Sequence, residues 1–341
     1  MESNADTTVS SESIDMTTSY TEEDVVYSGL VATRTIVLII SSTLIIIGNI
    51  VNLIVLPKLE TVQESTLVLL MGLAVIDLST GLFCGIFGIP SAITDTWMFG
   101  RGMCVIIGLL YTTTVGFSLI VLLLISVDRY IAITRPLRYP ELVNRKRAVA
   151  AMVASIASFP ITLYFLGTVD VPFDNVTFNP AYAQCLVDFG NPNNAVLSIT
   201  LLCSSVLGVI ATIAVIYLRI LCIAWKVGRA VAALRLDNPP GERQISRGFS
   251  KHEWKATRTT LIVTGGFTVA WLPYIITQIW SASSRQRLSA PGQFLVFILP
   301  TCNSWWNVLI YSVMNRQFRW TVKRMARLNQ GADFEHSANT D

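Results

Sequence analysis

The sequence predicts an all-α membrane protein, a seven-transmembrane helix bundle with a short amphipathic eighth helix. Only 14% of the 341 residues are charged, whereas soluble globular proteins average about 25%. A membrane helix needs about 20 mostly apolar residues to cross the hydrocarbon layer. Seven stretches of the chain have this length and composition: 35–57, 65–94, 103–127, 148–169, 195–218, 259–281 and 294–314.

The seven spans are almost free of charged residues. Six contain none, and the second contains only Asp77. Helices are predicted because lipid offers no partner to an unpaired backbone amide, and the short alternating strands of a β-barrel are absent. One such span alone would also fit a buried helix of a soluble protein, but seven in one short chain favour the membrane.

The polar segments outside the spans divide the chain into four parts. Residues 1–34 hold seven acidic residues, no basic residue before the last position, and no apolar core of a signal peptide. We therefore expect a disordered acidic extracellular tail there. Residues 35–314 form the predicted membrane domain. Residues 315–328 are expected to be an amphipathic cytoplasmic helix resting on membrane lipid, and residues 329–341 a disordered cytoplasmic tail.

Lys and Arg gather on one side of the predicted bundle. Of the 25, 21 fall in the segments 58–64, 128–147, 219–258 and 315–341. Such residues are retained in the cytoplasm, which predicts a multi-pass protein of the plasma membrane with its N-terminus outside. Two further signs agree with this topology. Asn175 begins a glycosylation sequon on the outer side, and Cys104 and Cys185 lie on the same oxidising side, where a disulfide between them is plausible.

Short motifs recur in order along the spans. They are Gly48-Asn49, Leu73-Ala74-x-x-Asp77, Asp128-Arg129-Tyr130 with Pro136-Leu137 after it, Phe267-x-x-x-Trp271-x-Pro273, and Asn307-Val308-Leu309-Ile310-Tyr311 with Phe318 after it. Over about residues 30–328 the chain thereby resembles the rhodopsin-like (class A) G-protein-coupled receptors. The segments 126–142 and 271–276 resemble the amine-receptor-like branch and its orphan relatives. The resemblance implies a heterotrimeric G protein and an extracellular ligand as partners, and no nucleic acid.

A carboxylate in the middle of the membrane is costly, so Asp77 is a functional candidate. A structural hydrogen-bond hub is the alternative. The resemblance implies a sodium site, whose oxygen ligands suit a hard cation. Its expected residues are Asp77, Ser118, Asn303, Ser304 and Asn307, with Asn49 beside them. Apart from this allosteric Na⁺, no cofactor is expected.

The resemblance also implies an activation switch around Arg129. Its neighbour Asp128 can neutralise it, and Glu253 lies 18 residues before Trp271, about five helical turns towards the cytoplasm. An Arg129–Glu253 pair would lock the inactive state. Alternatively, Glu253 is one solvated charge in a basic loop. The other residues implied in the switch and in coupling are Tyr130, Leu137, Tyr217 and Tyr311. The basic loops 135–147 and 219–258 fit a G protein, anionic lipid, or the positive-inside signal alone.

The expected ligand pocket is aromatic and hydroxylic. Its candidate residues are Tyr111, Thr112, Val115, Ser205, Trp271, Tyr274, Ile275, Gln278, Phe297 and Thr301. Tyr111 stands where amine receptors of this class carry an aspartate, and spans three to seven contain no acid. Because a buried cation needs a counter-charge, a neutral, lipid-like or peptide ligand is favoured over a monoamine. Thr301 stands where opsins carry the retinal lysine.

The chain departs from the family pattern at three positions. Val209 and Val308 replace prolines and Ala150 lies near the usual tryptophan, so straighter fifth and seventh helices are expected, and these losses are compatible with high basal activity. An enzyme is not expected, because the spans hold one acid and no histidine. A secondary transporter or channel, for which repeats or interrupted helices would be typical, and a decoy receptor that binds without coupling stay as alternatives.

Overall fold

The computed structural model of the chain describes residues 22–338 apart from 61, 169–175, 193–199, 201–205 and 238–250. Its elements in chain order are α1 (Glu22–Val55), the 3-10 helix η1 (Leu56–Lys58), α2 (Glu64–Phe83), the π-helix η2 (Cys84–Gly88), α3 (Ile89–Thr94), α4 (Gly100–Thr134), α5 (Tyr139–Leu142), α6 (Arg145–Thr168), β1 (Val176–Asn179), β2 (Gln184–Val187), α8 (Gly208–Asp237), α9 (Lys251–Ser284), α10 (Ala290–Met314) and α11 (Arg316–Ala338).

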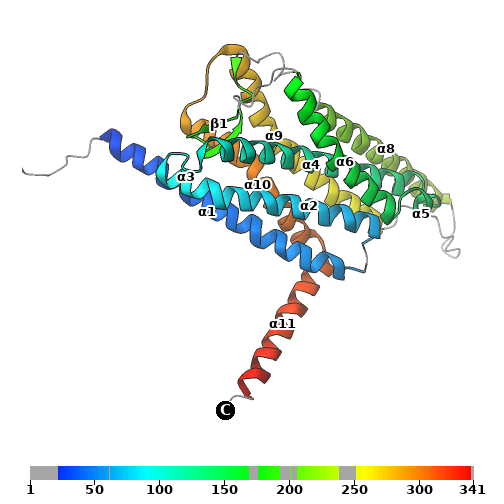
Figure 1. Cartoon of the computed structure of the whole chain (residues 1–341). Coiled ribbons are helices and arrows are strands. Elements are labelled where there is room, and N and C mark those ends of the chain that lie inside the picture. The colour runs from blue at the N-terminus through cyan, green and yellow to red at the C-terminus, as the bar shows by residue number, and fades with distance from the viewer. Residues whose placement is uncertain are drawn as a thin grey trace, which may run out of the picture.

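The long helices lie side by side in one bundle, as the sequence predicts (Figure 1). The strands β1 and β2 lie near the turn between α9 and α10, and we call this part of the molecule the hairpin end. The short helix α5 lies at the opposite end, where α4 finishes just after Arg129, and we call this the Arg129 end. The two ends carry the two groups of candidate residues.

The predicted membrane spans correspond to long helices. Within the described residues, six segments are long and apolar enough to cross a membrane: Tyr27–Lys58, Glu64–Thr94, Gly100–Thr134, Gly208–Lys226, Leu261–Ser284 and Ala290–Met314. The predicted span 148–169 corresponds to the helix α6, for which the structure describes side chains only as far as residue 157. Much of the first half of the predicted span 195–218 is also outside it, and α8 continues past 218 to Asp237.

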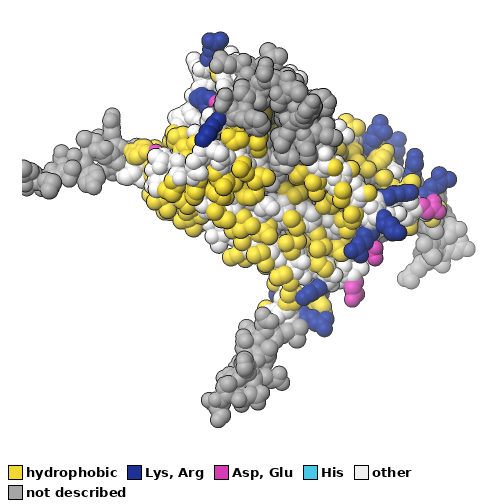
Figure 2. All heavy atoms as spheres, in the orientation of Figure 1, with side chains coloured by type: hydrophobic (Ala, Val, Ile, Leu, Met, Phe, Trp, Pro, Cys, Tyr) yellow, Lys and Arg dark blue, Asp and Glu magenta, His cyan; other side chains and the backbone are white. Residues whose placement is uncertain are grey.

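The outer face of the bundle is apolar. Large hydrophobic side chains point outward along the helices, with Val269 69% and Leu218 62% exposed. Figure 2 shows this hydrophobic surface over the middle of the bundle, with a larger group of Lys and Arg over the Arg129 end than over the hairpin end. A water-soluble protein rarely exposes so extended an apolar surface, whereas lipid solvates it without cost.

The first helix begins earlier than the sequence predicts. The prediction of disorder for 1–34 is wrong for residues 22–34, because α1 begins at Glu22. Tyr27 and Arg34 are seven residues apart and so lie on one face of the helix. Arg34 donates a 2.8 Å hydrogen bond to one carboxylate oxygen of Asp95, and Tyr27 donates to the other. These contacts with the end of α3 hold the extension in place.

The last helix is longer than predicted. Asn315 accepts hydrogen bonds from the backbone N–H groups of Gln317 and Phe318 at 3.0 and 3.3 Å, and this N-cap fixes the start of α11. The predicted end at 328 and the predicted disordered tail are wrong up to Ala338. Residues 329–338 contain no proline to stop the helix.

Two local features were not predicted. The second helix is interrupted by η2, in which Ile89 N–H bonds to the carbonyl of Cys84. Pro90, which follows directly, has no N–H for the regular ladder, and this accounts for the wider turn. The second feature is the antiparallel hairpin of β1 and β2, in which Phe178 lies opposite Cys185.

One helix runs unbroken where a family proline is missing. α10 continues through Val308 to Met314 and carries a proline at Pro300, whereas Val209 lies in the first turn of α8, directly after two π-helical residues, 206 and 207. The side chain of Val308 lies against Gly48 of α1, so the valine that stands in place of the proline makes a close contact between α10 and α1.

Candidate ligand pocket, ion site and arginine switch

A buried hydrogen bond joins α4 to α10 inside the hairpin end. Tyr111 Oη lies 2.9 Å from Thr301 Oγ1, and Thr301 also donates to the carbonyl of Phe297 at 3.1 Å. The rings of Tyr111 and Phe297 are 5.9 Å apart. All three side chains are buried. An aromatic and hydroxyl-bearing wall therefore forms where the sequence predicts a ligand pocket.

The helix α9 contributes a second wall. Trp271, Tyr274, Ile275 and Gln278 follow the spacing of one helical face, and all four are buried. Trp271 stacks on Phe267 at 5.7 Å and meets Tyr274 edge-on at 5.9 Å. This face brings all four of the predicted α9 pocket residues together.

Three predicted pocket residues differ from the rest. Val115 is half-buried and packs against both the main core and the Tyr111–Phe297 cluster. The hydroxyl of Thr112 donates at 2.9 Å to the carbonyl of Gly108 one turn earlier, so it serves its own helix. Ser205 lies outside the described residues.

The hairpin inserts into the pocket wall, which the sequence did not predict. Ala181, Tyr182 and Leu186 share one buried cluster with Tyr111 and Phe297. The Tyr182 ring stacks on that of Phe297 at 5.0 Å, and Gln278 Nε2 donates to Tyr182 Oη at 3.4 Å. The position of Tyr182, three residues before the candidate disulfide Cys185, was the signal that could have revealed this insertion.

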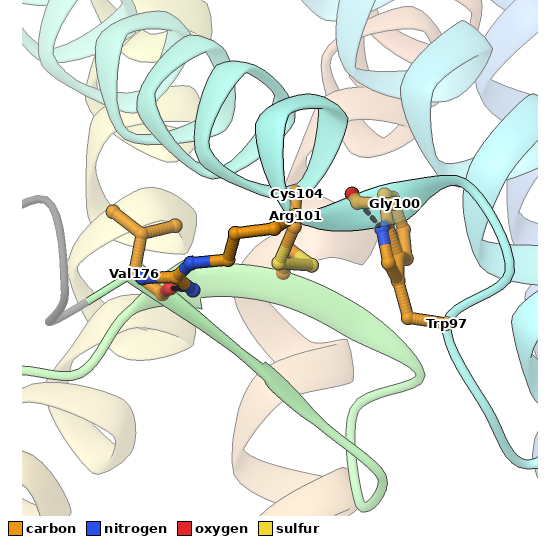
Figure 3. The surroundings of a disulfide bond; sticks show 6 residues. Trp97, Gly100, Arg101, Cys104 and Val176 are labelled. Carbon is orange, nitrogen blue, oxygen red and sulfur yellow. Dashed lines mark hydrogen bonds between the residues drawn. A yellow bond between two sulfur atoms is a disulfide. The ribbon is translucent and has the colours of Figure 1, made fainter.

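A disulfide fixes the hairpin on α4. Cys104 and Cys185 are bonded, which confirms the predicted pair. Figure 3 shows Arg101, one turn before Cys104, reaching under the helix to donate to the carbonyl of Val176 in β1. Gly108 faces Val176 and the backbone of Cys185, and a larger residue there would collide with the hairpin.

A buried polar cluster crosses the bundle at Asp77. Asn307 Nδ2 donates to the Asp77 carboxylate at 2.9 Å, and Asn49 Nδ2 donates to the carbonyl of Ser304 at 3.0 Å. The side-chain oxygens of Asn49, Asn52 and Asn307 have no hydrogen-bond partner among the described residues. One carboxylate with several free amide oxygens is a donor set that fits a hard cation such as Na⁺.

The remaining predicted ion-site residues come from α10 and α4. Asn303 and Ser304 are buried on α10. Ser118 on α4 donates to the carbonyl of Thr114 at 3.0 Å, which leaves the lone pairs of its oxygen to accept. The fit to a sodium ion therefore rests on Asp77 and the amide oxygens, with Ser118 as a further oxygen.

At the Arg129 end, Asp128 is the centre of a buried hydrogen-bond network. Arg129 Nη2 lies 2.5 Å from Asp128 Oδ2 and also donates to the hydroxyl of Thr66. Asp128, only 3% exposed, accepts from Thr66 at 2.8 Å, from Tyr139 at 2.6 Å and from Ser65 at 3.3 Å. We call these five residues the Asp128 hub.

Burial, followed by the nearby Asp128 carboxylate, raises the pKa of Tyr139 to about 12. The phenol therefore stays protonated and donates to Asp128 throughout the physiological pH range. The sequence predicted Asp128 and Arg129, but it missed Ser65, Thr66 and Tyr139, which come from α2 and α5.

The other predicted switch residues differ in how far they are exposed to solvent. Leu137 is 78% exposed beyond the end of α4, Tyr130 is half-buried, and Tyr217 is buried on α8. Three predicted sites depend on side chains or residues outside the description: Asn175, Glu253 and Tyr311. The Arg129–Glu253 pair and the glycosylation therefore stay predictions, while the described partners of Arg129 are Asp128 and Thr66.

A seven-helix bundle with a disulfide-anchored hairpin at one end and an Asp-Arg-Tyr motif at the other defines a class of membrane receptor. The profile of the family described as 7 transmembrane receptor (rhodopsin family) matches residues 48–311, and the chain belongs to this family. It is therefore a G-protein-coupled receptor, a multi-span protein of the plasma membrane and not an enzyme.

Individual relatives support the same assignment. The histamine H2 receptor of Canis lupus familiaris is 27% identical over 306 residues, covering 86% of this chain and 79% of the relative. The galanin receptor 2b of Danio rerio is 26% identical over 300 residues, covering 85% and 74%. The crystal structure of squid rhodopsin has the same fold, with a TM-score of 0.74 and 18% identity over 88% of this chain and 86% of that one.

Proposed function

We propose that this receptor senses a neutral ligand at the hairpin end and activates a heterotrimeric G protein at the Arg129 end, with its N-terminus outside the cell. The observation that carries the proposal is the separation of two buried groups of side chains, the aromatic cluster of Tyr111, Phe297 and Tyr182 and the Asp128 hub, at opposite ends of one bundle (Figure 1). The surface over the Arg129 end is rich in Lys and Arg, which supports placing that end in the cytoplasm.

The chemistry of the pocket favours a neutral ligand. None of the predicted pocket residues carries a carboxylate, and Tyr111 donates to or accepts from Thr301 rather than facing a charge. The relatives named above are receptors for an amine, histamine, and for a peptide, galanin. The carboxylate of Asp188, on the hairpin near Tyr182, is already paired with Arg287 at 2.5 Å. An amine would therefore find no free counter-charge here, so an aromatic peptide end or a lipid-like molecule fits better.

The mechanism is a shift between two states. In the described arrangement, Arg129 is held by Asp128 and Thr66, and the hub ties α4 to α2 and α5. A ligand that binds one arrangement of α9 and α10 more tightly than another shifts the population between them. Asp77 and Asn307 link α2 to α10 midway between the ends. They would hold a sodium ion with Ser118, Asn303 and Ser304, and its positive charge would neutralise the buried carboxylate.

The test is a measurement of basal coupling that needs no ligand. The purified receptor in nanodiscs is mixed with a panel of Gα subunits, and nucleotide exchange is followed for wild type, Arg129→Ala and the matched control Lys323→Ala. Lys323 is an exposed cation on α11. We expect wild type and the control to accelerate exchange on at least one Gα and Arg129→Ala to lose this effect. Equal exchange in all three proteins, or none in wild type, would contradict the proposal.

A further inference from the structure

The predicted ligand pocket is occupied by an aromatic side chain of the receptor itself. Tyr182 is only 6% exposed although it lies in the hairpin between α6 and α8. Its ring stacks on Phe297 of α10, and its hydroxyl accepts a hydrogen bond from Gln278 of α9. Phe297 in turn lies against Tyr111 of α4. One hairpin residue therefore occupies the place where α4, α9 and α10 meet.

A disulfide, an ion pair and a hydrogen bond hold the hairpin around Tyr182 in place. The disulfide Cys104–Cys185 joins it to α4, and Asp188 pairs with Arg287, just beyond α9, at 2.5 Å. Asn179 Nδ2 donates to Gln293 of α10 at 3.3 Å. A side chain held in this way has an effective concentration at its site far above that of a dilute free ligand.

The contacts of Tyr182 are those of a ligand. A ligand pocket encloses most of its occupant, lines it with aromatic side chains and supplies a few polar groups that orient it. Tyr182 meets all three conditions: a buried ring, stacking on Phe297 and one hydrogen bond from Gln278. Burial also raises the pKa of the Tyr182 phenol, so the occupant is neutral.

We propose that Tyr182 is a tethered agonist: it fills the predicted ligand pocket and shifts the population towards a signalling arrangement of α9 and α10, against the Asp128 hub, which favours the restrained arrangement, and so sustains basal activity. This inference rests on the proposed function, because it concerns the regulation of that same pocket. It also names the chemical class of an external ligand. A molecule that replaces Tyr182 carries a neutral, phenol-like aromatic group that stacks on Phe297 and accepts from Gln278.

The experiment removes the ring and returns it as a small molecule. Tyr182→Ala deletes a phenol group from the pocket, and engineered apolar cavities of this kind bind small aromatic molecules. The full-length variant in nanodiscs is assayed for basal Gα nucleotide exchange with and without phenol. We expect exchange to fall about fivefold or more, a typical size for coupling between two sites, and phenol to restore it. Cyclohexanol, of similar size but without an aromatic face, should restore little.

Phe178→Ala is the matched control. Phe178 lies in the same hairpin and is only partly buried, with its ring against Trp97 at 6.1 Å and away from the Tyr182 cluster. This variant should keep its basal exchange and ignore phenol. Basal exchange in Tyr182→Ala that equals or exceeds wild type would overturn the proposal. A fall that phenol does not reverse would overturn it too, because Tyr182 would then be a packing residue only.

A binding readout separates this inference from the proposed function. Phenol should raise the melting temperature of Tyr182→Ala, and leave those of wild type and Phe178→Ala unchanged, whether or not any Gα responds. If wild type activates no Gα but phenol stabilises the variant, the proposed function fails and the pocket occupancy stands. If wild type activates Gα and phenol does nothing to the variant, the tethered agonist fails alone. Should Tyr182→Ala be recovered poorly, phenol present from solubilisation onward should raise its yield selectively.

Discussion

The two ends of the bundle are held together by different kinds of interaction. The Asp128 hub joins its elements through one carboxylate that accepts from Arg129, Thr66, Tyr139 and Ser65. The hairpin end is held by a disulfide and by stacked rings, with Tyr182 on Phe297 and Phe297 beside Tyr111. One end depends on a single charge, whereas the other depends on a covalent bond and apolar area.

This difference predicts how each end responds to damage. Removing one partner from a buried ionic network leaves the other charge uncompensated, so its cost is concentrated at one atom. Apolar contacts are individually weak and add up over area, so their cost is spread over many side chains. The hub is suited to switch between two arrangements, and the hairpin to hold one arrangement.

The largest effect is expected at the hub. Asp128→Asn keeps the shape but removes the charge that pairs with Arg129 and accepts from three hydroxyl groups. We expect the free energy of unfolding to fall by about 3 kcal/mol, as for other broken buried pairs, and basal nucleotide exchange to rise. Thermal denaturation in nanodiscs and a Gα exchange assay measure the two effects. Tyr139→Phe, which removes one hydrogen bond and keeps the charge pair, should cost about half as much. Equal costs in both variants would mean that the charge does not matter.

The next effect is expected at the hairpin end. The double substitution Cys104→Ser with Cys185→Ser releases a loop of 81 residues and should lower the free energy of unfolding by about 2–3 kcal/mol. Because the two ends share no partner, this loss should add to that of Asp128→Asn. Combining the substitutions and measuring the melting transition tests this independence. A combined loss well below the sum would show that the ends are energetically coupled.

Much of the fold could be predicted from the sequence, because membrane helices are recognised by their length and by their lack of charged residues. The seven spans and the Cys104–Cys185 pair were predicted. The residues at which helices begin and end were harder to predict from the sequence. α1 extends back to Glu22 because Tyr27 and Arg34 meet Asp95, a contact between segments far apart in the chain. The wider turn η2 depends on backbone geometry before Pro90, which hydropathy does not report.

The sites divide in the same way. Asp77, Asp128 and Arg129 were predictable because a charge in or beside an apolar span needs a reason. Tyr182 and Tyr139 were not, because each is a common residue in a loop, and only folding buries it in its site. Sequence reasoning therefore found Asp77 together with its uncharged partner Asn307, but at the Asp128 hub it found the charged centre and missed the uncharged partners that α2 and α5 bring to it.

A smaller effect is expected inside the pocket wall. Thr301→Ala would leave the buried hydroxyl of Tyr111 without its described partner, whereas Tyr111→Phe would leave Thr301 still bonded to the carbonyl of Phe297. We expect losses of about 2 kcal/mol and about 1 kcal/mol, respectively, because an unsatisfied buried group costs more than a lost bond. The double variant should lose less than the sum in thermal denaturation. Strict additivity would show that the two hydroxyls do not interact.

The smallest effect is expected between the two ends, where Val308 replaces the family proline. A Cβ added to Gly48 would lie 3.0 Å from Val308 Cγ2, closer than ordinary contact, whereas Gly116 on α4 has nothing within 4 Å of the same position. Both substitutions to alanine gain helix propensity of up to about 1 kcal/mol. Gly116→Ala should therefore raise the melting temperature, and Gly48→Ala should leave it near or below that of wild type, because overpacking offsets the gain. Adding Val308→Ala to Gly48→Ala should recover stability relative to Val308→Ala alone. If Gly48→Ala proved as stabilising as Gly116→Ala, α1 and α10 would be able to move apart at this point. The contact between Val308 and Gly48 would then not fix the distance between these two helices.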